Sequence, residues 1–218
     1  MPWAKIPTLW IRSGQKLALL SWQKHRSDAT AALILLIALA IRLNQTNGKG
    51  KQRTAVSISY DELQSFTGIS RAKISAGIRL LEGNEIVVVR KRDKRNRYQL
   101  SGVTTPGSWA QLPQSQLLQN GTLLFAKFQL RQRNELHALK LYLLLIAYRN
   151  SKANFTAIGY EKICEIGGMQ RNDILRAASL LINYDLITVQ EQDPIPGTVG
   201  RPHKRYRICG LDKLQSSH

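Results

Sequence analysis

The sequence predicts a mainly helical α+β protein that is made of two copies of one domain. The motif "WAKIP" at Trp3 returns as "WAQLP" at Trp109, 106 positions later. Residues 60–89 align with residues 160–189 at a shift of 100, and "RYQLSG" aligns with "RYRICG" at a shift of 108. The shifts change only between these blocks, where loops absorb insertions. We therefore expect domains over residues 1–102 and 109–218, joined by a linker at 103–108.

Each copy is expected to contain an apolar helix, over Thr30–Leu43 in the first copy and Leu136–Tyr148 in the second. The first of these is apolar on all sides, which is typical of a buried central helix. Its apolar run, Ala31–Ile41, has 11 residues, whereas a membrane span needs about 20. No signal-peptide pattern accompanies it. We therefore expect a cytoplasmic, prokaryotic protein without a membrane partner.

Two shorter helices around a glycine turn are expected to follow. Ser59 and Glu62 have the spacing of a capping box, which starts a helix at Tyr60. Gly68 can end that helix in the left-handed conformation, and Ser70 can cap the next one. The inward face of the second of these helices is expected to be Ile74, Ile78 and Leu81. The second copy repeats the pattern in "GYEKICEIGG" and "MQRNDILRAASLLINYD".

A two-stranded hairpin is expected to close each copy. In the first copy "EIVVV" and "RYQL" flank the basic turn "RKRDKRN", and in the second "LITVQ" and "RYRI" flank a longer turn. The stretch "YDELQSFTGISRAKISAGIRLLE" resembles the helix-turn-helix of winged-helix DNA-binding proteins. Two such units resemble plasmid and phage replication initiators and regulators of mobile elements. The resemblance implies two tandem winged helix-turn-helix domains that arose by internal duplication.

The charge of the chain favours a polyanionic partner. Lys and Arg number 32 against 14 Asp and Glu, for a formal net charge of +18. The first copy, residues 1–108, has 18 basic and six acidic residues, and the second has 14 and eight. Such an excess repels itself within a compact fold, so double-stranded DNA is the expected partner. A ribosomal or membrane-surface protein could share the same charge.

The helix after the glycine turn is expected to enter the major groove and meet base edges with its N-terminal residues. The candidate contacts on these helices are Ser70, Arg71, Lys73, Ser75, Arg79, Gln170, Arg171, Asn172, Asp173 and Arg176. Gln and Asn can pair with adenine, Arg with guanine, and Asp can accept from cytosine. We therefore expect the second copy to read more sequence and the first to supply more phosphate affinity. A solvated helix face is the alternative for each residue.

The hairpins supply a second set of candidates. Six cations in the first hairpin are expected to contact phosphates or the minor groove: Arg90, Lys91, Arg92, Lys94, Arg95 and Arg97. A solvated hairpin tip is the alternative. The candidates in the second hairpin are Arg201, His203, Lys204, Arg205 and Arg207, while Glu191 and Asp193 are expected to face away from DNA.

The repeated openings are interpreted as core anchors. Trp3 and Trp109, with the Ile or Leu that follows each, are expected to pack onto the apolar helices, with a strand or short helix after each opening. The alternative is an exposed tryptophan that binds a partner or stacks on a base.

No enzyme is expected, because the chain has no glycine-rich phosphate loop, no paired carboxylates and no nucleophile with a nearby base. Neither a metal site, a cofactor nor a small-molecule ligand is expected, and Cys164 and Cys209 are interpreted as reduced, buried thiols. Tyr98 and Tyr206 could suggest strand nicking, but their repeated strand positions favour core packing.

The function expected is sequence-specific binding of double-stranded DNA, either to initiate replication of a plasmid-like element or to regulate transcription. Further copies of the chain and replication proteins are additional candidate partners. One alternative is an accessory subunit of a chromosome-organising ATPase that acts through protein contacts. RNA binding is a third option, and the absence of an aromatic stacking motif disfavours it.

Overall fold

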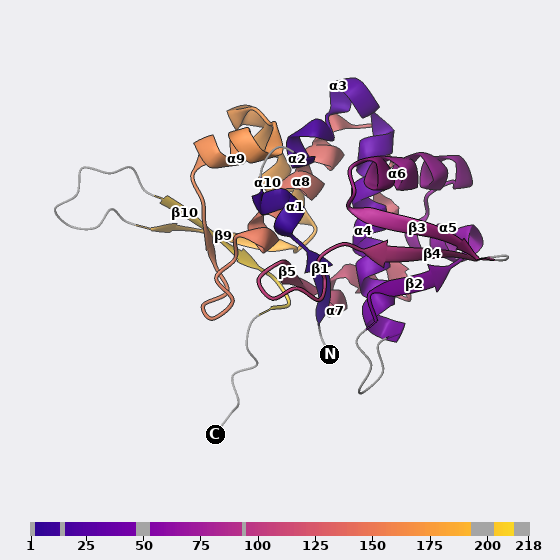
Figure 1. The fold of residues 1–218 in the computed structure, drawn as a ribbon. Helices are drawn as coiled ribbons and strands as arrows, with labels where there is room; N and C mark the ends of the chain where they lie inside the picture. The colour runs from indigo at the N-terminus through magenta and orange to yellow at the C-terminus, as the bar shows by residue number, and fades with distance from the viewer. Residues whose placement is uncertain (1–2, 14–15, 47–52, 93–94, 193–202, 212–218) are drawn as a thin grey trace.

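The computed structural model describes residues 3–13, 16–46, 53–92, 95–192 and 203–211. Within these ranges the protein has the mainly helical α+β fold that the sequence predicts, with small antiparallel sheets (Figure 1). We refer to the residues before and after Val103 as the first and second halves.

The two halves contain the same order of main elements. The first half consists of β1 (Trp3–Pro7), α1 (Leu9–Arg12), α2 (Lys16–Leu19), α3 (Trp22–His25), α4 (Ser27–Thr46), β2 (Ala55–Ile58), α5 (Tyr60–Thr67), α6 (Arg71–Gly83), β3 (Val87–Arg92) and β4 (Arg95–Leu100). The second consists of β5 (Trp109–Pro113), α7 (Gln114–Leu117), β6 (Leu118–Gln119), β7 (Thr122–Leu123), the 3-10 helix η1 (Leu124–Lys127), α8 (Arg133–Ala147), β8 (Thr156–Ala157), α9 (Tyr160–Gly167), α10 (Arg171–Asn183), β9 (Ile187–Gln192) and β10 (His203–Ile208).

Each half has a three-stranded antiparallel sheet with one pattern of connections. The strand order is β2-β4-β3 in the first half and β8-β10-β9 in the second. The last two strands of each half form the predicted hairpin, which is longer than the sequence indicates in both halves. In Figure 1 the β3–β4 hairpin extends to the right and the β9–β10 hairpin to the left, so the two hairpins lie on opposite sides of the molecule.

The local predictions around α5 and α6 are confirmed, except for the side-chain cap expected from Ser70. Ser59 and Glu62 form the capping box, and Gly68 ends α5 in the left-handed conformation at φ 70°. Ser70 occupies the N-cap of α6, although its side chain makes no capping hydrogen bond. The inward face of α6 is buried as expected: Ile74, Ile78 and Leu81.

The repeated openings pair with each other. β1 and β5 form an antiparallel ribbon in which Lys5 lies opposite Gln111, Trp3 opposite Pro113 and Pro7 opposite Trp109. This register is symmetric about its central pair, so an approximate twofold axis relates the two strands. The ribbon lies between the halves, where β1 also contacts α4 and β5 contacts α8.

The expected packing of the two tryptophans is wrong, whereas that of the aliphatic residues is confirmed. Ile6 and Leu112 are fully buried. Side chains alternate across a strand, so Trp3 and Trp109 lie on the other face of the ribbon. There their rings stack with centroids 5.9 Å apart and an interplanar angle of 10°. The ammonium group of Lys5 lies 4.3 Å from the centroid of the Trp109 ring.

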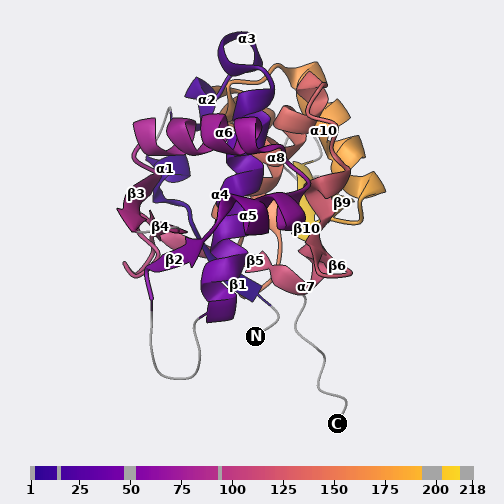
Figure 2. The ribbon, with the colours of Figure 1, turned by 90° about the vertical axis from the view of Figure 1, so that its right-hand side faces the viewer.

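The buried apolar side chains form one cluster that includes both halves. Its centre is α4, which contacts α6 in its own half and α8 in the other (Figure 2). α4 has 20 residues and is apolar enough to cross a membrane by length and composition alone, but most of it is buried inside the fold. This helix is longer than the predicted run because polar residues at both ends continue it.

The glycine turn of each half packs against a residue of the other half. An added Cβ on Gly68 would lie 3.3 Å from the Cβ of Ala126, and one on Gly168 would lie 3.0 Å from the Cβ of Ala18. Ala126 belongs to η1 and Ala18 to α2, so each contact crosses between the halves. Both glycines also have positive φ, which favours glycine over other residues.

Candidate nucleic-acid interface

The outward face of α6 contains part of the predicted contact set of the first half. Arg71 and Arg79 are exposed, as is Ser70 at the N-cap, while Ser75 is half-buried. The Arg71 guanidinium donates to Asp61 of α5 at 2.6 Å. Both partners are mostly exposed, so this ion pair adds little stability and leaves Arg71 available to another anion.

Lys73 of α6 contacts the first long helix. Its ammonium group lies 2.6 Å from a carboxylate oxygen of Asp28 in the first turn of α4, and its side chain is 39% exposed. This contact ties the start of α6 to the start of α4. The charge of Lys73 is therefore partly balanced by Asp28, which makes Lys73 a weaker candidate for DNA contact than the exposed Arg79.

The predicted contacts on α10 divide into two groups. Gln170, Arg171, Asn172 and Arg176 are exposed, as the sequence predicts. The expected outward position of Asp173 is wrong, because this residue is only 5% exposed. Its carboxylate is directed toward α8, where it lies beside the side chains of Arg133 and His137. Asp173 cannot accept a hydrogen bond from a cytosine while it holds that position.

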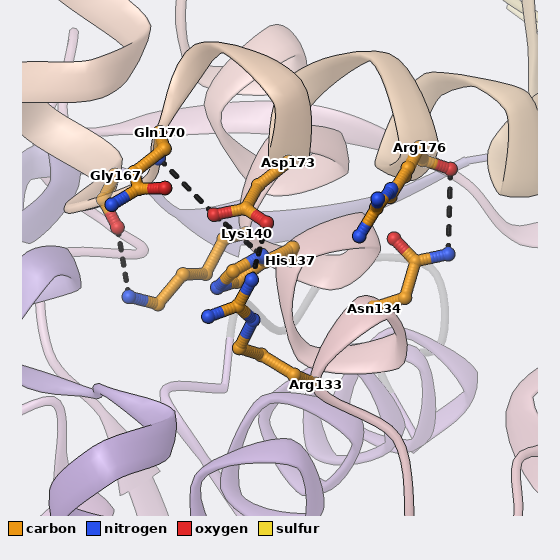
Figure 3. Close-up of polar contacts among 8 residues, drawn as sticks. All are labelled: Arg133, Asn134, His137, Lys140, Gly167, Gln170, Asp173 and Arg176. Atoms are coloured by element: carbon orange, nitrogen blue, oxygen red, sulfur yellow. Dashed lines mark hydrogen bonds and ion pairs between the residues drawn. The ribbon is translucent and has the colours of Figure 1, made fainter.

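A buried polar cluster joins α8, α9 and α10 (Figure 3). Arg133 donates to Asp173 at 2.8 Å, and His137 Nδ1 lies 3.6 Å from the other carboxylate oxygen. That oxygen also accepts from the backbone N–H of Gln170 at 3.3 Å, which caps the start of α10. Lys140 donates to the carbonyl of Gly167 at 2.8 Å. The cluster thus fixes the turn and the first residues of α10 to α8.

Burial controls the charge of this cluster. It lowers the pKa of His137 to about 4, an effect larger than the opposing attraction of Asp173. It lowers the pKa of Lys140 to about 8. His137 is therefore neutral near pH 7, whereas Lys140, with its pKa above 7, stays mostly protonated beside the ion pair of Arg133 with Asp173.

Each half has an ion pair between its long helix and the helix after the glycine turn, but the cation and the carboxylate are on opposite helices in the two halves. Lys73 and Asp173 occupy positions that align at a shift of 100. In the first half the cation is on α6 and the carboxylate on α4, whereas in the second the carboxylate is on α10 and the cation on α8. In both halves the pair joins the first long helix to the helix after the glycine turn.

The first hairpin presents cations directly opposite one another. Arg90 lies across from Arg97 in the register of β3 and β4, and both are exposed. Like charges in this relation destabilise a sheet. Arg95 lies 3.3 Å from Glu62 and is 60% exposed. Lys94 lies outside the described residues, and only the backbone is described for Lys91 and Arg92.

The second hairpin is described only at its base. Lys204, Arg205 and Arg207 are half-buried residues of β10. The Arg205 guanidinium carbon lies 4.7 Å from the centroid of the Phe155 ring, so this side chain packs on the second half itself. Arg201, Asp193 and the rest of the loop lie outside the described residues, and for His203 and Glu191 only the backbone is described.

A further set of cations, which sequence reasoning missed, precedes the first long helix of each half. Lys24 and Arg26 lie just before α4 and Arg131 just before α8, and all three are exposed. The ion pairs of Asp28 and Arg133 place these helix starts beside the starts of α6 and α10. The signal in the sequence that could have identified these cations is a pair of basic segments, "QKHR" just before α4 and "LRQR", which ends at the first residue of α8.

The strand tyrosines are buried, as predicted. Tyr98 is fully buried and Tyr206 is 2% exposed. Burial raises the pKa of Tyr98 to about 12, and that of Tyr206 is also raised. Neither hydroxyl is placed or ionised as a nucleophile for strand nicking. The two cysteines, Cys164 and Cys209, are half-buried rather than fully buried. In the described part of the chain, no group of three or more His, Cys, Asp and Glu could hold a metal ion.

A scan against protein-family models found no match to the chain, and a search of curated proteins found none.

Proposed function

We propose that the chain is a tandem winged-helix protein, the product of an internal duplication, that binds double-stranded DNA in a sequence-specific manner. In this proposal α6 and α10 enter major grooves, and the β3–β4 and β9–β10 hairpins are the wings. The observation that carries it is the order helix, strand, helix, glycine turn, helix and basic hairpin, present in both halves with one sheet topology.

The placement of charge supports the same conclusion. Exposed cations lie at the start of α6, along the first hairpin and before both long helices, within a chain of net charge +18. The opposed Arg90 and Arg97 weaken the hairpin unless an anion lies between them. Phosphates of a DNA backbone supply anions at such positions.

The twofold register of β1 with β5 bears on the DNA site. If the axis relates the whole halves, α6 and α10 approach DNA in opposite directions, as the two helices of a dimer do. Their exposed residues differ, so the two half-sites are inverted in direction but unlike in sequence. An asymmetric site for one chain follows, and its role is either initiation of replication on a plasmid-like element or regulation of transcription.

The test is selection of random duplex fragments by the purified full chain at about 150 mM salt, where nonspecific binding is weak. We expect enrichment of one asymmetric motif with two parts. Arg171→Ala should relax the preference at one position of one part, because an arginine on a guanine edge contributes about 1–3 kcal/mol of discrimination. Lys152→Ala, which changes an exposed residue far from α6 and α10 in sequence, is the control and should leave the motif unchanged.

Retention of fragments without a shared motif would contradict the proposal. Binding that then vanished with added salt would indicate only a general affinity for polyanions. The chain would in that case fit better as an accessory subunit that works through protein contacts.

A further inference from the structure

The exposed face of α10 has an apolar centre that α6 lacks. Leu175 is 47% exposed and Ile182 is 43% exposed. The positions 100 residues earlier hold Ser75 and Glu82 on α6. A single exposed leucine is ordinary on a protein surface. Its place among the candidate base-contacting residues is what distinguishes Leu175.

Leu175 lies between polar side chains on one helical face. It follows Arg171 by four residues and Asn172 by three, and it precedes Ser179 by four, the spacings at which helical side chains are neighbours. All three neighbours are exposed. On the opposite side of the helix, Ile174 and Ala177 are fully buried, so α10 cannot rotate to hide Leu175.

The Ser179 hydroxyl is not free to donate a hydrogen bond to a base from this face. Its hydroxyl donates to the backbone carbonyl of Leu175 at 3.0 Å, so the hydrogen is already used within the helix. Ile182 lies seven residues beyond Leu175, about 10 Å farther from the N-terminal end at 1.5 Å per residue. Of the two exposed large apolar side chains on α10, Leu175 is therefore the one nearer to the end that is expected to meet base edges.

The major groove offers one apolar group to such a side chain. Thymine carries a 5-methyl group there, and the other bases present hydrogen-bond donors and acceptors. We propose, on the basis of the proposed function, that Leu175 is a specificity-determining residue that contacts a thymine methyl group in the half-site read by α10. Asn172 and Arg171 then contact the adjoining base pairs.

The test uses the full chain and its selected DNA site. Each thymine is replaced in turn by deoxyuridine, which removes only the methyl group, and the affinity is measured. The half-site of α10 is identified as the one whose preference Arg171→Ala relaxes. At one thymine of that half-site we expect a loss of about fourfold, which corresponds to about 0.8 kcal/mol for one buried methyl group at about 1.4 kcal/mol per tenfold change.

Variants assign the effect to Leu175. Leu175→Ala and Leu175→Ser, the second of which copies Ser75 of α6, should bind thymine and deoxyuridine sites equally well. Ile182→Ala is the matched control, since it removes a similarly exposed side chain from the same helix, and it should keep the fourfold preference. The exposure of Leu175 makes unfolding of its variants unexpected, and circular dichroism verifies their fold.

The outcomes separate the two proposals. If no motif is selected at all, the proposed function fails and this inference fails with it. If a motif is selected but deoxyuridine has no effect in the α10 half-site, the inference alone is overturned. The same holds if the preference persists in Leu175→Ala, because another group then contacts the methyl.

Discussion

Among the described glycines of the first half, Gly77 has the least room for a side chain, so replacing it with alanine should weaken the fold. A Cβ at this position would lie 2.8 Å from Leu35 Cδ1, 2.9 Å from the backbone nitrogen of Ala32 and 3.1 Å from the carbonyl carbon of Ala31. The leucine methyl can move, but the two backbone atoms belong to α4 at the centre of the core. The Gly77→Ala variant must therefore push α6 away from α4.

The magnitude follows from two opposing effects. Overpacking of a core costs about 1–3 kcal/mol, while alanine in place of glycine favours a helix by about 0.8–1.0 kcal/mol. Gly83→Ala is the matched control, because it lies in the same helix and a Cβ there would meet nothing within 4 Å. If the helical gain is similar at both positions, Gly77→Ala should be less stable than Gly83→Ala by about 1–3 kcal/mol.

The assay is urea unfolding of the wild type and both variants, with the free energy of unfolding obtained by linear extrapolation. We expect Gly83→Ala to be at least as stable as the wild type. A Gly77→Ala protein equal to or more stable than Gly83→Ala would refute the close approach of α6 and α4. At the aligned position the second half already has an alanine, Ala177, which is fully buried, so that half accommodates a Cβ there.

Three further predictions concern the charges and the ribbon. Burial holds the pKa of His137 at about 4, against about 6.5 in an unfolded chain, so unfolding takes up a proton between these values and stability should fall as pH drops from about 6.5 to 4. Urea unfolding at several pH values should show this slope, and His137→Gln should reduce it. The stacked Trp3 and Trp109 should give an exciton couplet in far-ultraviolet circular dichroism, which Trp109→Phe removes and Trp22→Phe leaves intact. Arg90→Ala and Arg97→Ala should each lower the slope of log affinity against log salt by about 0.9, one phosphate contact each; an unchanged slope would place these arginines away from DNA, and Lys152→Ala is the control.

Much of the fold could be predicted because its signals are local. The capping box of Ser59 with Glu62 and the left-handed Gly68 depend on residues within a few positions of each other. The burial of Ile74, Ile78 and Leu81 follows from helical periodicity. The hairpins follow from pairs of short strand-like runs that flank a polar turn. Such features need no knowledge of distant parts of the chain.

The candidate site was less predictable because its residues depend on distant partners. Asp173 reads as an exposed helix residue until Arg133 and His137, 40 and 36 positions earlier in the sequence, are placed beside it. The same spatial relation makes Lys24, Arg26 and Arg131 candidates, since their helices begin beside α6 and α10. The predicted domain boundaries stay a prediction, while the buried cluster continues through both halves.

The sequence by itself determined that several blocks of the chain recur in the same order, roughly where the main helices lie, and that the chain carries a large excess of positive charge. The tertiary structure alone decided that "WAKIP" and "WAQLP" pair with each other and stack Trp3 on Trp109. It also decided which charged side chains are exposed and which form ion pairs between helices. The reason is physical: periodicity and capping act over one or two turns of chain, whereas strand pairing and buried ion pairs join residues that only the folded chain brings together.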